Sequence, residues 1–374
     1  MVSKTLFVVA ASMAAVAVAQ QPLTLPTIDT TPPAAPEWLS LVDASKVAKA
    51  PVGAKCAEGG ADPFCHWTCT TCLRTNKTDV ATCPKGQWAL TFDDGPTEFT
   101  PALLDFLKQN NLKVTFFLMG SQVRKFPDLV KRAYAEGHEL AGHTWSHTPL
   151  TTLTNEQIIS ELKWTEEAIF QAVGKRIKYI RPPQGDMDDR VRDIAAQLGY
   201  KIFQWDVDTN DWKIRSKEIT IPQVIANFAK PIGEFATRQT GVLSLEHDHA
   251  KETVDIAISN IPKLVKAGYK PILASQCIGE ASAYRDGPAS SAASSLPASS
   301  SVVVPASSSS AAPVVSQSVV PQQVVPQANT QQASSKSSAP AAAQSAGPAK
   351  TSDASKVLGF GFLGFAGFVA SLLL

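Results

Sequence analysis

The chain has 374 residues, and its 34 lysines and arginines nearly balance its 33 aspartates and glutamates, which leaves a net charge of +1. A near-neutral chain without a basic patch excludes the electrostatic footprint of a nucleic-acid-binding protein. The length allows more than one domain, and shifts in composition divide the chain into five segments.

Residues 1–19 have the pattern of a secretory signal peptide. Lys4 precedes an apolar run over residues 6–18, and a small-x-small site ends at Ala19. The apolar run is too short to span a membrane comfortably. We therefore expect cleavage before Gln20 and a secreted protein.

Residues 20–85 are rich in Pro, Thr and Cys and have little apolar periodicity, so we expect an irregular extension tied by disulfides. The chain has six cysteines, and an even number in a secreted protein favours disulfides over free thiols: Cys56, Cys65, Cys69, Cys72, Cys83 and Cys277. A zinc knuckle at the CxxC of residues 69–72 is disfavoured in an oxidising compartment. Asn76 opens an Asn-Lys-Thr acceptor for N-glycosylation.

Residues 86–279 alternate short apolar runs with amphipathic stretches. Strands are expected at 88–92, 114–118, 139–142, 179–180, 200–205, 241–245 and 271–274. Helices are expected at 128–135, from Thr154 with a capping box to Gln157, and at 187–198, 222–229 and 254–266. Repeated β-then-α units predict a parallel sheet with helical crossovers. Seven or eight units favour a small (β/α) barrel, with a flat doubly wound sheet as the alternative.

The last two segments are compositionally distinct from the rest of the chain. Residues 280–347 consist mainly of Ser, Ala, Pro, Val and Gln, which predicts a disordered, O-glycosylated stalk. Residues 348–374 join a polar spacer to an uncharged apolar end, the pattern of a GPI-attachment signal, with attachment at Ser345 or Gly347. The alternative is a transmembrane helix, but no basic residue follows it. We therefore expect a protein held at the cell membrane and wall by a GPI lipid.

Polar side chains gather directly after five of the expected strands. They are Asp93 with Asp94, HTWSH at 143–147, RPPQGD at 181–186, DTNDW at 208–212 and LEHD at 245–248. The carboxyl ends of parallel barrel strands meet at one face, where active sites lie. Five such groups on successive strands therefore predict an active site at that face.

His143 and His147 indicate a metal site within this group. Because they are four residues apart, both imidazoles would reach one ion from a single helical turn. Two histidines and one carboxylate leave a coordination position open for water. An isolated pair of this kind more often caps a turn or packs in a core, but the acid pair on a neighbouring strand favours the metal.

The five stretches, in this order and spacing, resemble the motifs of the polysaccharide deacetylase family (carbohydrate esterase family 4, NodB homology). The resemblance covers residues 86–277, roughly half the chain. It implies a distorted (β/α) barrel. Together with the stalk and the anchor signal, the chain is similar to the fungal members that act on chitin.

The resemblance implies a role for each matching residue. Asp93 corresponds to the general base and Asp94 to a metal ligand beside His143 and His147. Arg181 corresponds to the arginine that pairs with the base and holds it ionised.

The remaining motif residues correspond to the other half of the site. His247 matches the general acid, and Asp211 matches the carboxylate that tunes it. Gln184 stands where the family commonly has Tyr and would lend its backbone N–H to the oxyanion. Trp212 and Leu245 would line the acetyl pocket.

The implied reaction is metal-dependent hydrolysis of N-acetyl groups in chitin, which yields chitosan and acetate. One divalent ion is expected, Zn²⁺ by default, with Co²⁺ or Mn²⁺ able to serve. Chitin or its oligomers would be the substrate, and a monomer is expected. The alternatives are O-deacetylation of another wall polysaccharide, such as acetylxylan, and a glycan-binding wall protein without catalysis.

Other polar and aromatic residues near the motifs receive lesser roles. Second-shell support or a solvated loop is expected for Asp206, Asp208, Asp248 and His249. His66 and His138 are interpreted as structural. Trp145 could equally stack a sugar ring or pack in the core.

One disulfide is predicted from barrel closure. Cys83 precedes the first barrel strand and Cys277 follows the last, so closure would bring the two together. The other four cysteines allow three pairings, and the sequence does not choose among them.

Overall fold

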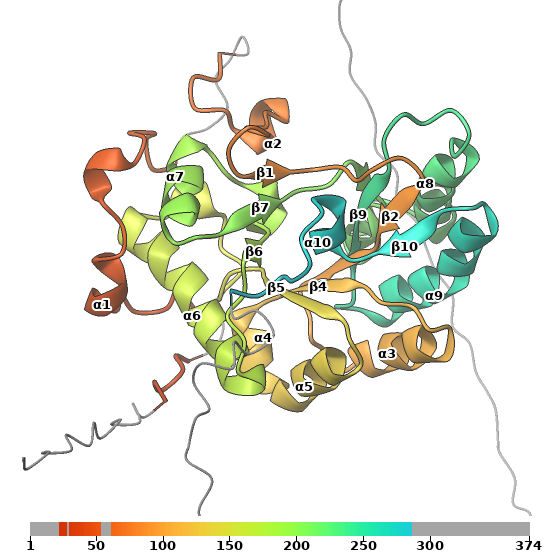
Figure 1. Ribbon diagram of the computed structural model, residues 1–374, viewed down its shortest axis with the longest axis horizontal. Helices are drawn as coiled ribbons and strands as arrows, with labels where there is room; N and C mark the ends of the chain where they lie inside the picture. The colour runs from red at the N-terminus through yellow and green to blue at the C-terminus, as the bar shows by residue number, and fades with distance from the viewer. Residues whose placement is uncertain (1–21, 28–29, 54–60, 286–374) are drawn as a thin grey trace, which may run out of the picture. The chain divides into compact units, whose positions relative to one another are not determined.

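The computed structural model describes residues 22–27, 30–53 and 61–285 (Figure 1). The expected signal peptide, the anchor signal with Ser345 and Gly347, nearly all of the stalk and Cys56 lie outside the described residues. Among the described residues, no helix is both long and apolar enough to cross a membrane.

A parallel sheet forms the centre of the molecule, as predicted. Its strands are β1 (Asp79–Val80), β2 (Gln87–Ala89), β3 (Thr91–Asp93), β4 (Thr115–Leu118), β5 (Glu139–Gly142), β6 (Tyr179–Ile180), β7 (Lys201–Phe203), β8 (Val207–Asp208), β9 (Val242–His247) and β10 (Lys270–Ile272). The order is β1-β7-β6-β5-β4-β3-β9-β2-β10, with β8 paired to β9. Every pairing between these strands is parallel.

The strand pairings close into a circuit. β7 and β8 lie on one continuous segment, residues 201–208, which pairs with β6 at one end and with β9 at the other. β9 pairs in turn with β3, and β3 leads back through β4 and β5 to β6. A flat doubly wound sheet has two edge strands and cannot form such a circuit. The strand pairings therefore favour the predicted distorted barrel.

Both faces of the central strands are buried. Adjacent residues on a strand point to opposite faces, and they pack into two different hydrophobic clusters. One cluster includes Leu90, Phe92 and Phe116 and extends under the surrounding helices. The other includes Ala89, Phe117 and their neighbours on the strands and lies inside the barrel. Asp93, on β3, is the register partner of Phe117, and this places its side chain on the face of the strands that the second cluster occupies.

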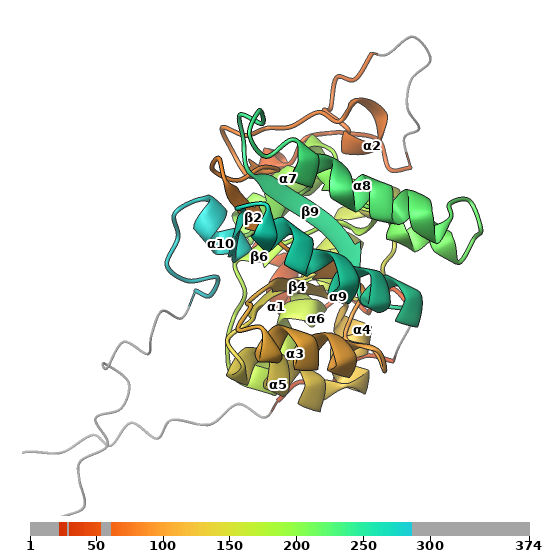
Figure 2. The same cartoon turned by 90° about the vertical axis from the view of Figure 1, so that its right-hand side faces the viewer.

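Helices cover the outside of the sheet (Figure 1). The long ones are α3 (Thr100–Gln109), α4 (Gly120–Lys125), α5 (Pro127–Ala135), α6 (Asn155–Val173), α7 (Asp189–Gln197), α8 (Ile221–Gly233) and α9 (Lys251–Lys266). Figure 2 shows α9 beside β9, and α8 packs against α9 and β8. The capping box that starts α6 is present, because Thr154 Oγ1 accepts from the N–H of Gln157 and Gln157 accepts from the N–H of Thr154.

The cysteine-rich extension packs onto the barrel through short elements. These are α1 (Pro36–Leu39), α2 (Trp67–Thr70) and β1, which extends the sheet beside β7. Disulfides join Cys65 to Cys72 and, as predicted from closure, Cys83 to Cys277 near the short helix α10 (Ala274–Cys277). Cys69 is disulfide-bonded as well.

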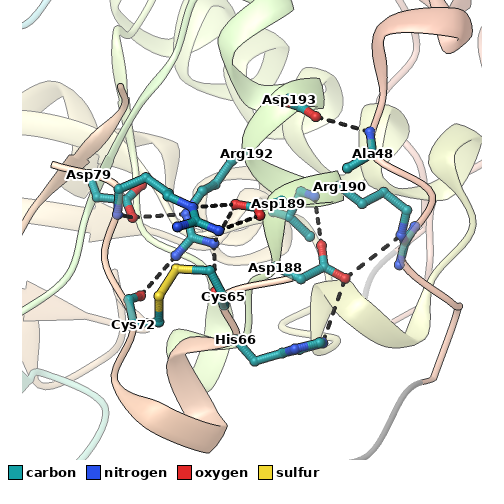
Figure 3. A network of polar contacts seen from close by, with 12 residues as sticks. Ala48, Cys65, His66, Cys72, Asp79, Asp188, Asp189, Arg190, Arg192 and Asp193 are labelled. Carbon is teal, nitrogen blue, oxygen red and sulfur yellow. Dashed lines mark hydrogen bonds and ion pairs between the residues drawn. A yellow bond between two sulfur atoms is a disulfide. The ribbon is translucent and has the colours of Figure 1, made fainter. Parts of the chain in front are cut away.

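A buried arginine fixes the extension to α7, as Figure 3 shows. The Arg192 guanidinium donates to Asp79 Oδ2 at 2.8 Å, to the Cys65 carbonyl at 2.6 Å and to the Cys72 carbonyl at 3.0 Å. Nearby, the partly exposed Arg74 pairs with Asp189 at 2.8 Å. One side chain on α7 therefore holds both ends of the Cys65–Cys72 loop.

We expect Arg192→Met to lower the free energy of unfolding by about 3–5 kcal/mol, because it leaves the buried Asp79 carboxylate without its charged partner. Arg74→Met, the matched control at the same surface, should cost no more than about 1 kcal/mol, because water screens an exposed pair. Urea unfolding followed by circular dichroism measures both. Equal losses for the two variants would contradict the role given to Arg192.

Candidate active site

The five polar stretches meet at the carboxyl ends of the strands, as predicted. They surround a cavity of about 440 Å³. It is lined by Asp93, Asp94, His143, His147, Gln184, Trp205, Asp208, Trp212, Leu245 and His247. Eight of these ten residues were predicted for the site, and Trp205 and Asp208 were not.

Asp93, the last residue of β3, is paired with a buried arginine. Asp93 Oδ1 accepts a hydrogen bond from Arg181 Nη1 at 2.7 Å, and both side chains are almost fully buried. The carbonyls of Phe203 and Gln204 fix the same guanidinium at 3.1 and 3.0 Å. Arg181 is therefore held rigidly against this carboxylate.

Burial dominates the pKa of Asp93 and raises it to about 6, although the charges of Arg181 and His247 lower it. The family resemblance led us to expect that Arg181 holds this acid ionised. The arginine offsets only part of the desolvation. The carboxyl is thus poised to exchange a proton near neutral pH.

Asp94 faces two histidines. Its Oδ1 lies 3.3 Å from His147 Nε2 and 3.5 Å from His143 Nε2. His143 Nδ1 lies 2.7 Å from the Arg181 carbonyl, so this nitrogen carries the proton and the lone pair of Nε2 is directed at Asp94. The three residues thus converge on one point.

The predicted helical turn between His143 and His147 is wrong. Residues 143–149 form an irregular loop in which Thr144 and His147 have left-handed backbone, with φ of 64° and 60°. Asp94 also has positive φ, at 74°, which breaks the alternation of β3 and turns its side chain away from that of Asp93. Three strained residues, rather than a helix, bring the ligand atoms together.

The chemistry of this group fits a divalent transition-metal ion. The ligand atoms of Asp94, His143 and His147 all lie within 4.8 Å of one another. Asp94 Oδ1 is buried without a hydrogen-bond partner, and burial lowers the pKa of His143 to about 3, which keeps it a neutral ligand. Burial acts to raise the pKa of Asp94, but the surrounding imidazoles outweigh it and lower this pKa to about 2. An ionised carboxylate and a neutral imidazole are the forms that bind Zn²⁺.

His247, at the end of β9, is held by Asp211 across the cavity. Its backbone N–H donates to Asp211 Oδ2 at 2.9 Å, and its Nδ1 lies 2.7 Å from Asp211 Oδ1. Burial acts to lower the pKa of His247, but the Asp211 carboxylate outweighs it and raises this pKa to about 10. The imidazole is therefore a cation at neutral pH, with Nδ1–H bound and Nε2–H free.

The other predicted site residues form the walls. Gln184 is exposed, with left-handed backbone at φ 57°. Leu245 is buried, whereas 43% of the Trp212 surface is exposed at the cavity mouth. Trp205 lies between β7 and β8, and it was missed as a wall residue because the sequence placed it at the end of the expected strand at 200–205 rather than in a polar stretch.

The extension supports this wall. Trp67 of α2 contacts Trp205 edge-on, with ring centroids 5.6 Å apart. A Cβ at Gly185 would lie 2.4 Å from the Trp67 ring, so only glycine fits beside Gln184. The cysteine-rich segment thus packs directly behind one wall of the cavity.

Most residues that were given lesser roles make contacts outside the metal-ligand group, and His249 is the exception. Asp206 bonds Arg238 and the N–H of Leu243, and Asp248 accepts from Thr100. Trp145 is fully buried and packs in the core, and His66 and His138 are buried away from the cavity lining. His249 differs, since its Nδ1 lies 3.5 Å from Asp94 Oδ2.

Comparison with known proteins agrees with this geometry. The polysaccharide deacetylase family model matches residues 81–203. A solved chitin deacetylase from Colletotrichum lindemuthianum superposes with a TM-score of 0.52 at 32% identity, covering 56% of this chain and 96% of that one. The chain belongs to the polysaccharide deacetylase family.

The curated relatives with similar sequences include proteins named chitin deacetylase. Chitin deacetylase 1 of Cryptococcus neoformans var. grubii is 40% identical over 277 residues, which cover 68% of this chain and 58% of the relative. Chitin deacetylase 1 of Saccharomyces cerevisiae is 36% identical over 219 residues, which cover 58% of this chain and 67% of the relative. The match thus spans less than two thirds of the Cryptococcus protein.

Proposed function

We propose that this protein is a metal-dependent deacetylase that hydrolyses the N-acetyl groups of N-acetylglucosamine units in chitin. The observation that carries the proposal is the pair of proton-exchanging groups, on neighbouring strands, beside one ligand set. Asp93 is held by Arg181 and His247 by Asp211, and both border the cavity that contains Asp94, His143 and His147. The curated relatives that carry the name chitin deacetylase support the same substrate.

Asp94, His143 and His147 would hold the ion, which when bound would polarise the acetamide carbonyl and activate a water molecule. Zn²⁺ is the proposed metal, with Co²⁺ as a substitute. Asp93 takes the proton from the attacking water.

The charge that develops on the carbonyl oxygen needs a donor from the protein. We assign this role to the backbone N–H of Gln184. The next two N–H groups, of Gly185 and Asp186, donate to the carbonyls of Pro182 and Pro183. A side chain other than Tyr is acceptable there, since the contact is made by the backbone.

His247, the register partner of Asp93 on the neighbouring strand β9, completes the reaction. An amine leaves an amide only after it is protonated, and His247 carries a proton on Nε2 while Asp211 occupies Nδ1. The pKa values of base and acid lie near 6 and 10, so both groups have the required protonation state between these values.

Asp211→Asn should move the alkaline limb of activity to lower pH. His247 must be protonated to act, and without the carboxylate its pKa falls from about 10 toward the ordinary value near 6.5. A pH profile of kcat/KM measures the shift. Asp206→Asn removes a nearby carboxylate that contacts Arg238 instead, and its limb should stay in place. An unmoved limb in Asp211→Asn would rule out His247 as the acid.

The deciding experiment is mass spectrometry of a defined chitin oligomer after incubation with the metal-loaded protein. Loss of about 42 mass units per acetyl group, abolished by a chelator and restored by Zn²⁺, is expected. The matched substrate is an acetylated xylan oligomer. Acetate release from xylan alone would replace the proposal with O-deacetylation, and release from neither would overturn catalysis.

We further propose that the protein acts outside the cell. The Cys65–Cys72 and Cys83–Cys277 disulfides require an oxidising compartment, and Asn76 is exposed for glycosylation. For a GPI anchor at Ser345 or Gly347, treatment of intact cells with a GPI-specific phospholipase should release the protein.

A further inference from the structure

The second oxygen of Asp94 faces a different pair of histidines. While Oδ1 is directed at His143 and His147, Oδ2 lies 3.5 Å from His249 Nδ1. The rings of His249 and His247 contact each other edge-on, with centroids 5.1 Å apart. One carboxylate thus lies between two histidine pairs.

These residues form a second possible ligand set. The ligand atoms of Asp94, His247 and His249 lie within 4.8 Å of one another, the same criterion that the first set meets. His247 Nδ1 is bound by Asp211, so Nε2 is the nitrogen left for an ion. An Asp–His–metal arrangement of this kind is the usual support for a ligand imidazole.

His249 lies close to Asp94 and contacts the His247 ring, but its imidazole is incompletely hydrogen-bonded. Its Nδ1 is buried without a hydrogen bond, although 17% of the side chain remains exposed. A buried imidazole nitrogen without a partner is costly. A cation between this nitrogen and Asp94 Oδ2 would give the nitrogen its missing partner.

We propose that Asp94 Oδ2, His247 and His249 bind a second divalent transition-metal ion that inhibits the enzyme, with Asp94 bridging the two ions. The inhibitory effect rests on the proposed deacetylase function, whereas binding does not. In carboxylate-bridged sites the two ions lie about 3.5–4 Å apart. The ions repel each other and share one carboxylate, so the second binds more weakly than the first.

Inhibition is expected because the second ion binds the same nitrogen of His247 that donates the proton. A metal on Nε2 of His247 replaces the proton that the leaving amine needs. Activity therefore rises as the first site fills and falls as the second fills. The loss at saturation should reach about 10²-fold, the lower range for removal of a general acid.

The binding test uses the full-length protein stripped of metal by a chelator and titrated with Co²⁺. Bound metal is counted by equilibrium dialysis, and visible absorption reports each site. The wild type should bind a second equivalent in a weaker phase, and His249→Gln should lack that phase. His138→Gln, which removes a buried imidazole remote from the cavity lining, should keep both phases.

The activity test follows deacetylation of a chitin oligomer over the same Co²⁺ range, each variant scaled to its own maximum. The wild type and His138→Gln should lose activity as the weaker phase fills, and His249→Gln should not. A wild type that binds a single equivalent, or a weaker phase that persists in His249→Gln, overturns the second site.

The two proposals fail in different ways. Two bound equivalents without deacetylation at any metal concentration would refute the proposed function and leave the second site standing. Deacetylation with one equivalent bound and no inhibition would refute the second site alone. Because the wild-type titration is decisive by itself, the test does not depend on the folding of a variant.

Discussion

Asp93→Asn should lower kcat for deacetylation by about 10²–10⁴-fold, the range found when a general base is removed. Asparagine has the same shape and can still accept from Arg181 through its carbonyl oxygen, so the buried guanidinium keeps a partner. What is lost is the ability to take a proton. The acid limb of the kcat/KM profile, expected near the Asp93 pKa of about 6, should disappear with it.

Two controls separate this effect from damage to the fold. Asp206→Asn makes the same chemical change at a carboxylate that bonds Arg238 and the Leu243 N–H, and it should retain activity within a few-fold of wild type. Metal stoichiometry of Asp93→Asn should match that of wild type, because the expected ligands are Asp94, His143 and His147. A loss of less than about tenfold in kcat would assign the base elsewhere.

Regular elements could be predicted where an apolar run or a helix cap was clear in the sequence. The strands at 139–142 and 179–180 were predicted with their observed bounds, and the helix after Thr154 begins as its capping box indicates. Helix α3 was missed, although Pro101 near its start and the spacing of Leu103 and Leu107 were available signals. β1 and β8 were missed, because Asp79–Val80 lies in the segment without apolar periodicity and Val207–Asp208 overlaps the start of a polar stretch.

The site shows a different limit of sequence reasoning. The i, i+4 spacing of His143 and His147 suggested a helix, but the same spacing fits a loop with left-handed residues, and only tertiary contacts select the loop. The pairing of Asp93 with Arg181 crosses 88 residues of chain. It was expected from resemblance to a family, because no local rule connects positions so far apart.

His249 was undervalued for a related reason. Its importance depends on the direction of the second oxygen of Asp94, which the positive φ of that residue sets. Burial is also a property of the whole fold. Without it, Arg181 alone would suggest a low pKa for Asp93, whereas desolvation raises this pKa to about 6.

His147→Gln should weaken binding of the first metal ion by more than about 100-fold, because even second-shell changes cost 10–100-fold and this change removes a direct ligand. His147 is the preferred position for the test, since its side chain is 31% exposed and that of His143 only 2%. Substitution there leaves the core intact. Deacetylation at limiting Zn²⁺ should fall to background and recover partly at high Zn²⁺.

Metal content after dialysis and the Zn²⁺ dependence of activity measure this prediction. His138→Gln is the matched control and should keep both the metal and the activity. A partial recovery at high Zn²⁺ distinguishes a weakened site from a lost fold, because an unfolded protein gains nothing from added metal. If His147→Gln retained wild-type affinity, His147 would not be a ligand of the first ion, and Asp94, His247 and His249 would be the other candidate set among the described residues.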